Sequence, residues 1–503
     1  MWIITIVYVA AVALLALYGA NSLWLVFRYY RTRGKQPKAD ALTVFPQVTV
    51  QLPTFNELHV VQRLLQAVTS QDYPRNRLQI QVLDDSTDET LTVLRALVAE
   101  YQDQGVDIEV IHREERSGYK AGALAAGLPV AKGEFVAVFD ADFVPPRDWL
   151  RRAVPYIVAD PSVGFVQTRW GHINAPYSPL TMVQAIILDA HFGIEHPARN
   201  RSGYFMNFNG AAGLWRKKCI LEVGDWSGST LTEDLDLSYR AQIKGWRALY
   251  LSEVEAEAEL PPQLAAFKNQ QFRWAKGSAQ CLRQLAGPIL RSHYSLGIRL
   301  EALLHMSGYL CYPMMLLVLL LSLPLLWWGY PTNLPLAYLS IVSLGPPLIF
   351  IASQFVLYGQ QPRGMAWWRR AAYVPLVLLF GFGMGATNAW AVIEGLVGRS
   401  NEWPRTPKFS VECRGDSWAH DPYAVRLSAD VLVDLLFALY ALAAVTVAYV
   451  RRLYWAMPFM LVYALGFGSV VVVTLWQSYE SHRPVARKRP TRLATSPEAT
   501  SDK

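Results

Sequence analysis

Apolar residues divide the chain into a polar central part and two membrane-like flanks. Residues 31–300 mix apolar and polar positions as a water-soluble domain does, whereas residues 2–26 form one uncharged run long enough to cross a bilayer. Four basic residues follow that run: Arg28, Arg31, Arg33 and Lys35. The positive-inside rule then predicts an anchor with its N-terminus outside and the next domain in the cytosol. A cleaved signal peptide is the alternative, but its basic residues would precede a shorter apolar run.

Further apolar runs follow the central part. Four are long enough to span a membrane, at residues 303–328, 336–357, 429–450 and 454–476. Another, residues 371–396, contains Gly381, Gly383, Gly385 and Asn388 and ends with Glu394, so it either spans the membrane or re-enters it. The basic tail after residue 482 favours re-entry or an interfacial position, because that arrangement keeps the tail in the cytosol.

These boundaries predict six regions along the chain. They are an N-terminal transmembrane anchor (1–29), a cytosolic domain (30–300), two transmembrane helices (301–360), a re-entrant or interfacial segment with a loop (361–427), two more transmembrane helices (428–478) and a disordered basic cytosolic tail (479–503).

Strand and helix patterns alternate within the central part. Short runs rich in β-branched residues predict strands at residues 47–52, 78–83, 107–111, 134–139 and 163–167. Helical periodicity marks residues 57–69, 89–98 and 120–128. This order predicts an α/β domain with a mostly parallel sheet and helices on both faces. Ligands bind beyond the carboxyl ends of such strands, so polar clusters at those ends should meet in one crevice.

Composition agrees with a membrane protein. Apolar residues make up 52% of the chain, charged residues 17%, and the mean hydropathy is +0.16, which is too apolar for an ordinary soluble enzyme. The net charge of +7 does not indicate nucleic-acid binding, because much of the excess flanks apolar runs, where it sets topology and attracts anionic lipid. The four cysteines show no paired spacing, and we assign them no role.

The motif Asp140-Ala141-Asp142 follows the fourth predicted strand. Two carboxylates in a loop suit Mg²⁺ or Mn²⁺ that also binds a diphosphate, whose departure the metal would assist as a Lewis acid. A turn or helix cap before the following prolines is the alternative, and it is the usual explanation for an isolated Asp-x-Asp.

Two polar clusters end the first two predicted strands. Asp85 is a candidate ligand for a nucleobase or ribose, while Asp88 is suited to cap the next helix. Thr54 and Glu57 lie after the first strand, where Glu57 is either a donor ligand or a first-turn acid favoured by the helix dipole.

A basic side chain lies near a predicted helix start in Gly118-Tyr119-Lys120. Lys120 beside flexible backbone suits a phosphate, and a solvated lysine is the alternative.

The motif Thr232-Glu233-Asp234 precedes an amphipathic segment, residues 235–243. A carboxylate at a helix N-terminus could take the proton from an attacking hydroxyl. Simple capping by Thr232 and the two acids explains the motif equally well.

The motif Gln270-Gln271-Phe272-Arg273-Trp274 places an aromatic ring, a cation and amides close together. Trp274 suits a sugar ring and Arg273 a diphosphate. An interfacial helix is a compatible alternative, because Lys268, Arg273 and Lys276 would also suit a membrane surface.

The four acidic and aromatic motifs, in this order, carry a resemblance to a known family. Over roughly residues 45–290 the chain resembles the membrane-integrated family 2 glycosyltransferases of the cellulose-synthase superfamily. It is most similar to the cellulose-synthase-like A group of β-mannan and glucomannan synthases. That likeness rests on the segments VLDDSTDET, GYKAGAL, FDADF, VQTRW, FNGAAGLWR and LTEDLDLSYRAQIKGW.

The resemblance implies a GT-A (Rossmann-like) fold and a role for each motif. It implies donor binding by Thr54, Glu57, Asp85, Lys120 and Asp140, a metal held by Asp140 and Asp142, catalysis by Asp234 as general base with Glu233, and an acceptor and pyrophosphate site of Gln270, Arg273 and Trp274. The implied reaction inverts an α-linked hexose of GDP-mannose or UDP-glucose into a β-glycoside. The polysaccharide would leave through the chain's own spans in the plasma (inner) membrane, with accessory export subunits as possible partners.

One segment departs from the family pattern. Bacterial cellulose synthases carry a gating loop reading FxVTxK, and the equivalent residues 402–408 match it only at Thr406 and Lys408, with two prolines added. No nucleotide-dimer receptor domain follows, so the resemblance does not extend to that regulation.

Three other functions remain as alternatives. A lipid glycosyltransferase of the same superfamily would add one sugar to a membrane acceptor, and product length separates it from a polymerase. A non-catalytic sensor would not need all four motifs to be intact. A transporter would show repeated halves with paired broken helices, which this sequence lacks.

Overall fold

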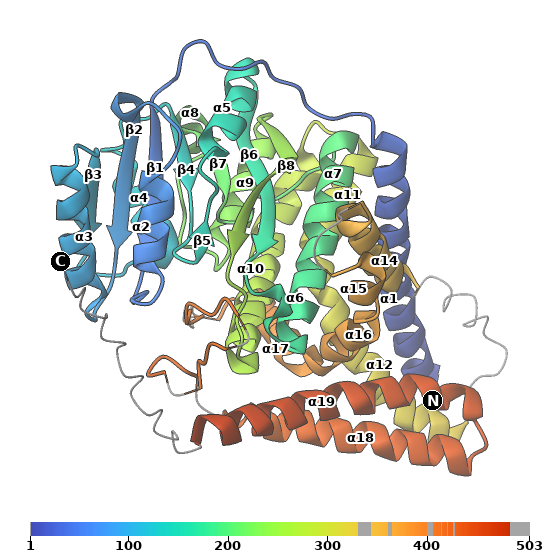
Figure 1. Ribbon diagram of the computed structural model, residues 1–503. Helices are drawn as coiled ribbons and strands as arrows, with labels where there is room; N and C mark the ends of the chain where they lie inside the picture. Colours follow the sequence, from blue (N-terminus) through green and yellow to red (C-terminus); the bar gives the residue numbers. More distant parts are fainter. Residues whose placement is uncertain are drawn as a thin grey trace, which may run out of the picture.

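A mixed β-sheet and a group of apolar helices lie side by side in the computed structural model (Figure 1). The structure describes residues 2–329, 344–360, 365–399, 406–413, 415–419, 421–425 and 428–482. Residues 483–503 of the predicted tail and residues 402–405 of the gating-like loop lie outside these residues, whereas residues 479–482, predicted to be disordered, form the end of a helix.

One half of the sheet is parallel, as the sequence predicts. The strand order is β3-β2-β1-β4-β7-β6-β8-β5, and the first four strands pair in parallel. Their bounds lie within two residues of the predicted ones: β1 Val48–Thr54, β2 Leu78–Asp84, β3 Ile108–His112 and β4 Phe135–Val138.

The other half corrects the prediction of a mostly parallel sheet. Strand β7 (Gly213–Arg216) runs antiparallel to both β4 and β6 (Val163–His172). Strand β8 (Arg247–Ala258) is parallel to β6, and β5 (Phe143–Val144) is antiparallel to β8. Strands β5 and β7 are too short to show periodicity, and β8 carries acidic residues at alternate positions, so the sequence did not reveal them.

Two helical layers cover the sheet, because alternate strand residues face opposite sides. Phe135 and Ala137 of β4 pack with one layer, while Val136 and Val138 pack with the other. The first layer is α2 Val61–Thr69, α3 Thr90–Asp103 and α5 Trp149–Ala159. The second is α4 Tyr119–Gly127, α8 Lys217–Glu222 and α9 Glu233–Ile243.

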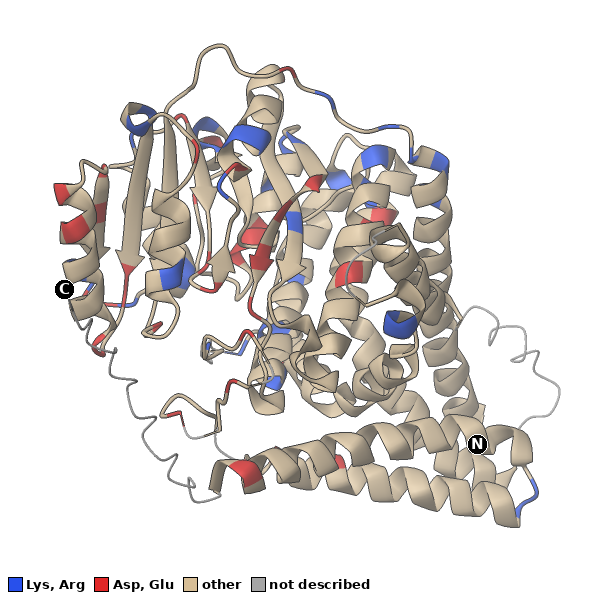
Figure 2. Ribbon diagram, viewed as in Figure 1, with Lys and Arg blue, Asp and Glu red and all other residues tan. Residues whose placement is uncertain are grey.

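The described chain contains four helices long and apolar enough to cross a membrane, or five if one bent pair is a single span. The four are α1 Trp2–Thr32, α12 with its preceding turn (Gly308–Trp328), α18 Asp430–Val450 and α19 with its preceding turn (Tyr454–His482). Figure 2 shows charged residues concentrated over the sheet, with few along α18 and α19. The predicted anchor and three of the four later predicted spans coincide with these helices.

The two remaining apolar segments differ from simple spans. Residues 371–396, predicted to be ambiguous, lie in a helix pair bent by 49° between Trp367–Gly383 (α15 Trp367–Ala371 and α16 Val374–Gly383) and α17 Gly385–Val397. Within the predicted span 336–357, the described residues form the short helix α14 Gly345–Tyr358, and the segment before residue 344 lies outside the description.

Helix α10 (Leu264–Arg291) joins the two halves of the molecule. Lys276 pairs with Glu394 of α17 at 3.0 Å, and Lys268 pairs with Asp434 of α18 at 2.5 Å. A Cβ at Gly395 would lie 2.5 Å from the Lys276 carbonyl oxygen, so the close approach of α17 requires glycine there. The other connecting helices are α6 Pro179–Ala190, α7 His196–Ser202 and α11 Leu296–Met306.

Candidate active site

The predicted site residues all line one pocket at the carboxyl ends of the parallel strands. They are Thr54, Glu57, Asp85, Lys120, Asp140, Asp142, Glu233, Asp234, Gln270, Arg273, Trp274, Thr406 and Lys408. The strand ends, the start of α9, helix α10 and the segment after residue 405 each contribute. The structure therefore brings these side chains together, and the role of each stays a prediction.

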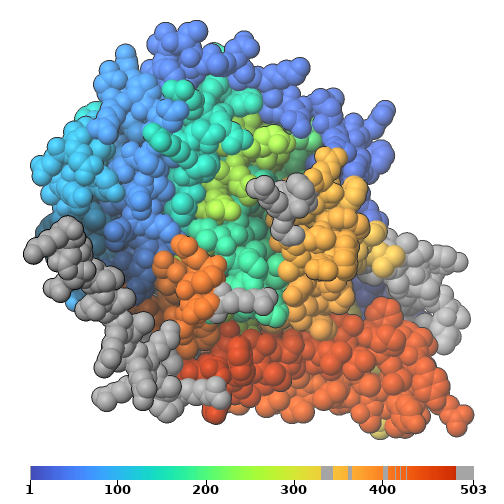
Figure 3. Space-filling model, viewed as in Figure 1, coloured from blue at the N-terminus to red at the C-terminus, as the bar shows by residue number. Residues whose placement is uncertain are grey.

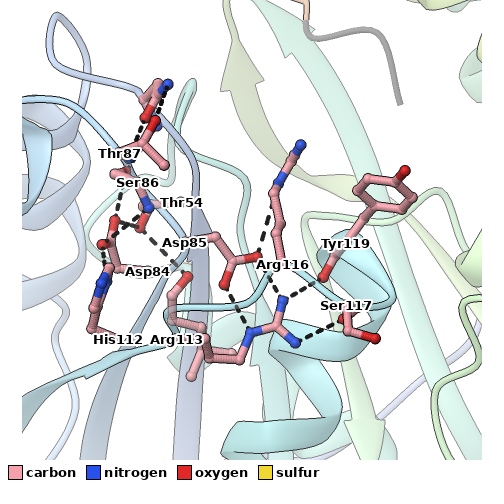
Figure 4. A network of polar contacts seen from close by, with 12 residues as sticks. Thr54, Asp84, Asp85, Ser86, Thr87, His112, Arg113, Arg116, Ser117 and Tyr119 are labelled. Carbon is pink, nitrogen blue, oxygen red and sulfur yellow. Dashed lines mark hydrogen bonds and ion pairs between the residues drawn. The ribbon is translucent and has the colours of Figure 1, made fainter. Parts of the chain in front are cut away.

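A carboxylate held by an arginine marks one end of the pocket, which we call the nucleoside end (Figure 4). Arg113 donates from Nε to Oδ1 of Asp85 at 2.8 Å and from Nη2 to Oδ2 at 2.6 Å. The Asp85 backbone N–H donates to the Thr54 carbonyl at 3.0 Å, which ties β2 to β1 at this point. Asp85 is thus a neutralised carboxylate in a fixed orientation.

The loops behind Asp85 are held by a second acid. Asp84 is fully buried and accepts from the Thr54 hydroxyl at 3.0 Å, while His112 Nδ1 lies 2.8 Å from its other oxygen. Thr54 therefore positions the loop. Asp88 accepts from the Thr90 N–H at 2.9 Å, in agreement with its predicted capping role.

The position of Glu57 excludes one of its two predicted roles. It does not lie in the first turn of the following helix, because α2 begins at Val61. Its backbone carbonyl accepts from the N–H groups of Val60 and Val61, and its side chain lines the pocket.

Lys120 lies at the start of α4 and enters the opposite end of the pocket, which we call the reaction end. Its ammonium group is 2.5 Å from Asp140 Oδ1 and 3.8 Å from Glu233 Oε1, and it donates to the Gly210 carbonyl at 2.9 Å. Burial alone would lower the pKa of Lys120, but the carboxylates of Asp140 and Glu233 outweigh it and raise the pKa. Gly118, at φ +70°, gives the turn before the helix its left-handed conformation. The alternative of a solvated lysine is wrong.

Asp140 and Asp142 follow β4 at the reaction end. Asp142 accepts from Lys408 Nζ at 2.6 Å, so each acid of the motif is paired with a lysine. Within the described ranges, no group of three His, Cys, Asp or Glu side chains is arranged to hold a metal. Two carboxylates alone fit a Mg²⁺ or Mn²⁺ site in which substrate phosphates and water complete the coordination.

Glu233 and Asp234 form the buried first turn of α9. Burial and the adjacent Glu233 raise the pKa of Asp234 from 3.8 to about 7, and burial also raises the pKa of Glu233. Asp234 Oδ1 accepts from the Leu235 N–H at 2.8 Å, whereas Oδ2 faces Gly210, where a Cβ would lie 3.0 Å away. The Thr232 side chain makes no cap hydrogen bond and lies 3.4 Å from Cys281 Sγ instead. Capping by Thr232 therefore does not explain the motif.

Helix α10 closes the wall of the reaction end with Gln270, Arg273 and Trp274. Burial lowers the pKa of Arg273, although the surrounding carboxylates oppose this effect. The suggestion that Lys268 and Lys276 face a membrane surface is wrong, because both are buried in the ion pairs with α18 and α17.

The described part of residues 406–425, which we call the 406–425 segment, lies against the pocket (orange in Figure 3). Lys408 donates to both Asp142 and the Glu259 carbonyl, and the Phe409 N–H donates to the Glu259 carboxylate at 3.0 Å. Two further ion pairs fasten the segment to α2 and the loop before it: Arg63–Glu412 at 2.7 Å and His59–Asp421 at 2.9 Å.

Comparison with known proteins agrees with this geometry. A model described as "Glycosyltransferase like family 2" matches residues 46–277, which include the whole sheet and the first half of α10. The chain carries a family 2 glycosyltransferase domain.

The glycosyltransferase domain has plant relatives. Glucomannan 4-beta-mannosyltransferase 1 of Oryza sativa subsp. japonica is 41% identical over 254 residues, covering 50% of this chain and 49% of the rice protein. Glucomannan 4-beta-mannosyltransferase 2 of Arabidopsis thaliana is 41% identical over 252 residues, covering 49% and 47%. A probable glucomannan 4-beta-mannosyltransferase 7 of rice is 34% identical over 383 residues, covering 72% and 64%. The chain spans about half the length of the first two relatives.

The GT-A fold has a solved counterpart. The mannosyltransferase PcManGT from Pyrobaculum calidifontis, solved with GDP-Man and Mn²⁺, matches with a TM-score of 0.53 at 22% identity. The match covers 78% of this chain and 100% of that chain.

Four residues of the glycosyltransferase domain's pocket region were missed from the sequence: Arg113, Arg116, Asn209 and Gly210. Arg113 and Arg116 follow β3 directly, so two basic residues after a predicted strand end were the available signal. Asn209 is held by two histidines: its Nδ2 lies 3.0 Å from His191 Nε2, and its Oδ1 lies 2.6 Å from His196 Nε2. No local sequence pattern predicts these contacts.

Proposed function

We propose that this chain is an inverting, processive β-glycosyltransferase. It transfers hexose from a nucleotide sugar, GDP-mannose or UDP-glucose, to a growing β-1,4-linked mannan, glucomannan or glucan. GDP-mannose is the favoured donor, because the plant relatives are named glucomannan mannosyltransferases and the solved counterpart contains GDP-Man.

The observation that supports this proposal best is the division of charge within one pocket. Asp85 and two arginines form the nucleoside end, whereas Asp140, Asp142, Glu233 and Asp234 gather at the reaction end. A nucleotide sugar is divided in the same way. Its base lies at one end, and its diphosphate, which requires cations, lies near the sugar at the other end.

Asp234 is the group proposed to act as general base. The acceptor hydroxyl oxygen attacks the anomeric carbon while the bond from that carbon to the diphosphate oxygen breaks, and the hydroxyl proton passes to the carboxylate. A pKa near 7 suits a base that works at neutral pH, and Oδ2 is the oxygen turned toward Gly210 and the pocket. Glu233 supports it by sharing Lys120 with Asp140.

Mg²⁺ or Mn²⁺ would be held by Asp140 and Asp142. A bound divalent cation supplies charge to stabilise the leaving diphosphate. Lys120 and Arg273 contribute fixed positive charge to the same leaving group, with no proton to exchange at neutral pH.

The acceptor enters where the domain meets the apolar helices. Trp274 offers a ring face to the terminal sugar, and Gln270 offers an amide, both from α10, which contacts α17 and α18 through buried ion pairs. This position lets the polymer pass from the pocket into the helices. We place the glycosyltransferase domain in the cytosol and the helices in the plasma membrane, following the positive-inside rule.

Product analysis tests the proposal. Purified protein in detergent is given GDP-mannose or UDP-glucose with Mg²⁺ or Mn²⁺, and the product is sized and digested. A long product from GDP-mannose that β-mannanase degrades is expected. A single sugar on lipid would replace the polymerase with a lipid glycosyltransferase, and a cellulase-sensitive product from UDP-glucose alone would replace the donor.

A further inference from the structure

Arg116 lies in the nucleoside end, where its ion pair with Asp85 is long. Its guanidinium carbon is 3.5 Å from the centre of the Phe55 ring and its Nε is 4.0 Å from Asp85 Oδ2, too far for a hydrogen bond. That Nε is buried and has no hydrogen-bond partner among the described residues. In Figure 4 the guanidinium end points away from the Asp85–Arg113 pair.

Arg116 is not needed to balance the charge of Asp85. Arg113 already donates to both oxygens of that carboxylate, so a second arginine adds positive charge rather than balancing it. Burial lowers the pKa of Arg116, Asp85 opposes this effect only in part, and the like charges of Arg273 and Arg113 add to it. A buried donor of this kind stays costly until a ligand accepts from it.

Stacking on Phe55 fixes the plane of the guanidinium. An arginine that lies flat on an aromatic ring keeps its N–H donors in that plane, and the fork of two donors matches two neighbouring acceptors. Among bases, guanine presents such a pair at O6 and N7, and an arginine fork on that edge discriminates between bases. Uracil has a single acceptor at the corresponding edge, and adenine places an amino donor beside N7.

We propose that Arg116, held on Phe55, recognises the O6/N7 edge of the guanine base of the donor and so determines nucleotide specificity. This inference rests on the proposed function with GDP-mannose as donor. The diphosphate is the competing partner, because Arg273 acts on both Arg116 and the reaction-end carboxylates, and the comparison of GDP with UDP separates the two partners.

Nucleotide analogues test the pairing directly. Binding of GDP, 7-deaza-GDP (which lacks the N7 acceptor) and UDP is measured by calorimetry on the full chain in detergent with Mn²⁺. The proteins are the parent, Arg116→Ala, Arg116→Lys and the control Arg95→Ala on the exposed face of α3. Thermal melting confirms that each variant is folded.

The parent should bind 7-deaza-GDP about tenfold more weakly than GDP. Arg116→Ala should weaken GDP binding by about 10–100-fold, abolish the difference between GDP and 7-deaza-GDP, and change UDP binding little. Arg116→Lys, which keeps the charge without the fork, should also lose that difference, while Arg95→Ala should match the parent.

Two outcomes overturn the inference while leaving the proposed function intact. One is equal weakening of GDP and UDP in Arg116→Ala with the 7-deaza difference retained, which would make Arg116 a phosphate ligand. The other is unchanged GDP binding in a folded Arg116→Ala. A parent that binds UDP and not GDP would instead refute GDP-mannose as the donor, and the inference with it.

Discussion

The two ends of the pocket balance their charges in different ways. At the nucleoside end one carboxylate, Asp85, is bonded by Arg113 and lies beside Arg116. At the reaction end four carboxylates face three cationic side chains: Asp140, Asp142, Glu233 and Asp234 against Lys120, Lys408 and Arg273. The first end has an excess of positive charge in the protein alone, whereas the second has an excess of negative charge.

This difference separates positioning from chemistry. Arg113 holds the Asp85 carboxylate through two hydrogen bonds, and we propose that this pair fixes where a nucleoside binds. Burial is the main cause of the raised pKa values of Glu233 and Asp234, and neighbouring carboxylates raise them further. The reaction end is therefore suited to bind a cation and to accept a proton. We expect variants at the nucleoside end to affect stability and nucleoside binding, and variants at the reaction end to affect turnover and metal-dependent donor binding.

The largest effect is expected from Asp234→Asn. The amide is nearly isosteric but cannot accept the acceptor's proton, so turnover should fall about 10²–10⁴-fold while donor affinity is largely kept. Initial rates and donor affinity are measured together, with Asp103→Asn at the exposed end of α3 as the matched control. Unchanged turnover would remove Asp234 from the mechanism.

The metal site gives the next effect. Asp142→Asn should raise the Mn²⁺ concentration needed for donor binding by at least about tenfold, because it removes one of the two carboxylates proposed to hold the metal. Titration of Mn²⁺ at fixed donor concentration measures it. If the parent bound donor equally well in EDTA, the metal role of Asp142 would be wrong.

A stability effect is expected at the other end. Arg113→Ala leaves the Asp85 carboxylate buried without its bidentate partner, which costs about 3 kcal/mol and should lower Tm by several degrees. Melting curves of this variant are compared with those of Arg95→Ala. A melting temperature equal to that of the parent would show that the nucleoside end is not held by this pair.

The smallest effect concerns pH and stability. The pKa of Asp234 is about 7 in the folded chain and about 4 when unfolded, so its contribution to stability is present below pH 4 and is lost as pH rises through 7. Asp234→Asn does not titrate. In EDTA, its Tm relative to the parent should therefore rise by about 2–4 °C from pH 5 to pH 8. A difference in Tm that does not change with pH would contradict the raised pKa.

Local patterns predicted the parallel half of the sheet and the acids at its strand ends. Strands β1, β2 and β4 carry clear periodicity, and parallel strands bring their carboxyl ends to one edge, so Thr54, Asp85 and Asp140 had to converge. The antiparallel strands β7 and β8 lacked such a signal, being short or lined with acids.

Contacts between distant parts of the chain could not be predicted locally. Lys268 and Lys276 resemble surface residues until the helices carrying Asp434 and Glu394 are placed beside them. Thr406 and Lys408 were identified through the family resemblance alone, and the Lys408–Asp142 pair joins residues far apart in the sequence. Arg116 gains its significance only from its position on Phe55.

The most direct test of the account compares guanosine with GDP, each titrated by calorimetry with and without Mn²⁺. Guanosine occupies only the nucleoside end, so its affinity should not change with the metal, whereas GDP should bind at least about tenfold more tightly when Mn²⁺ is present. Metal-independent GDP binding, or guanosine binding that requires Mn²⁺, would contradict the division of the pocket into a nucleoside end that needs no added cation and a cation-deficient reaction end.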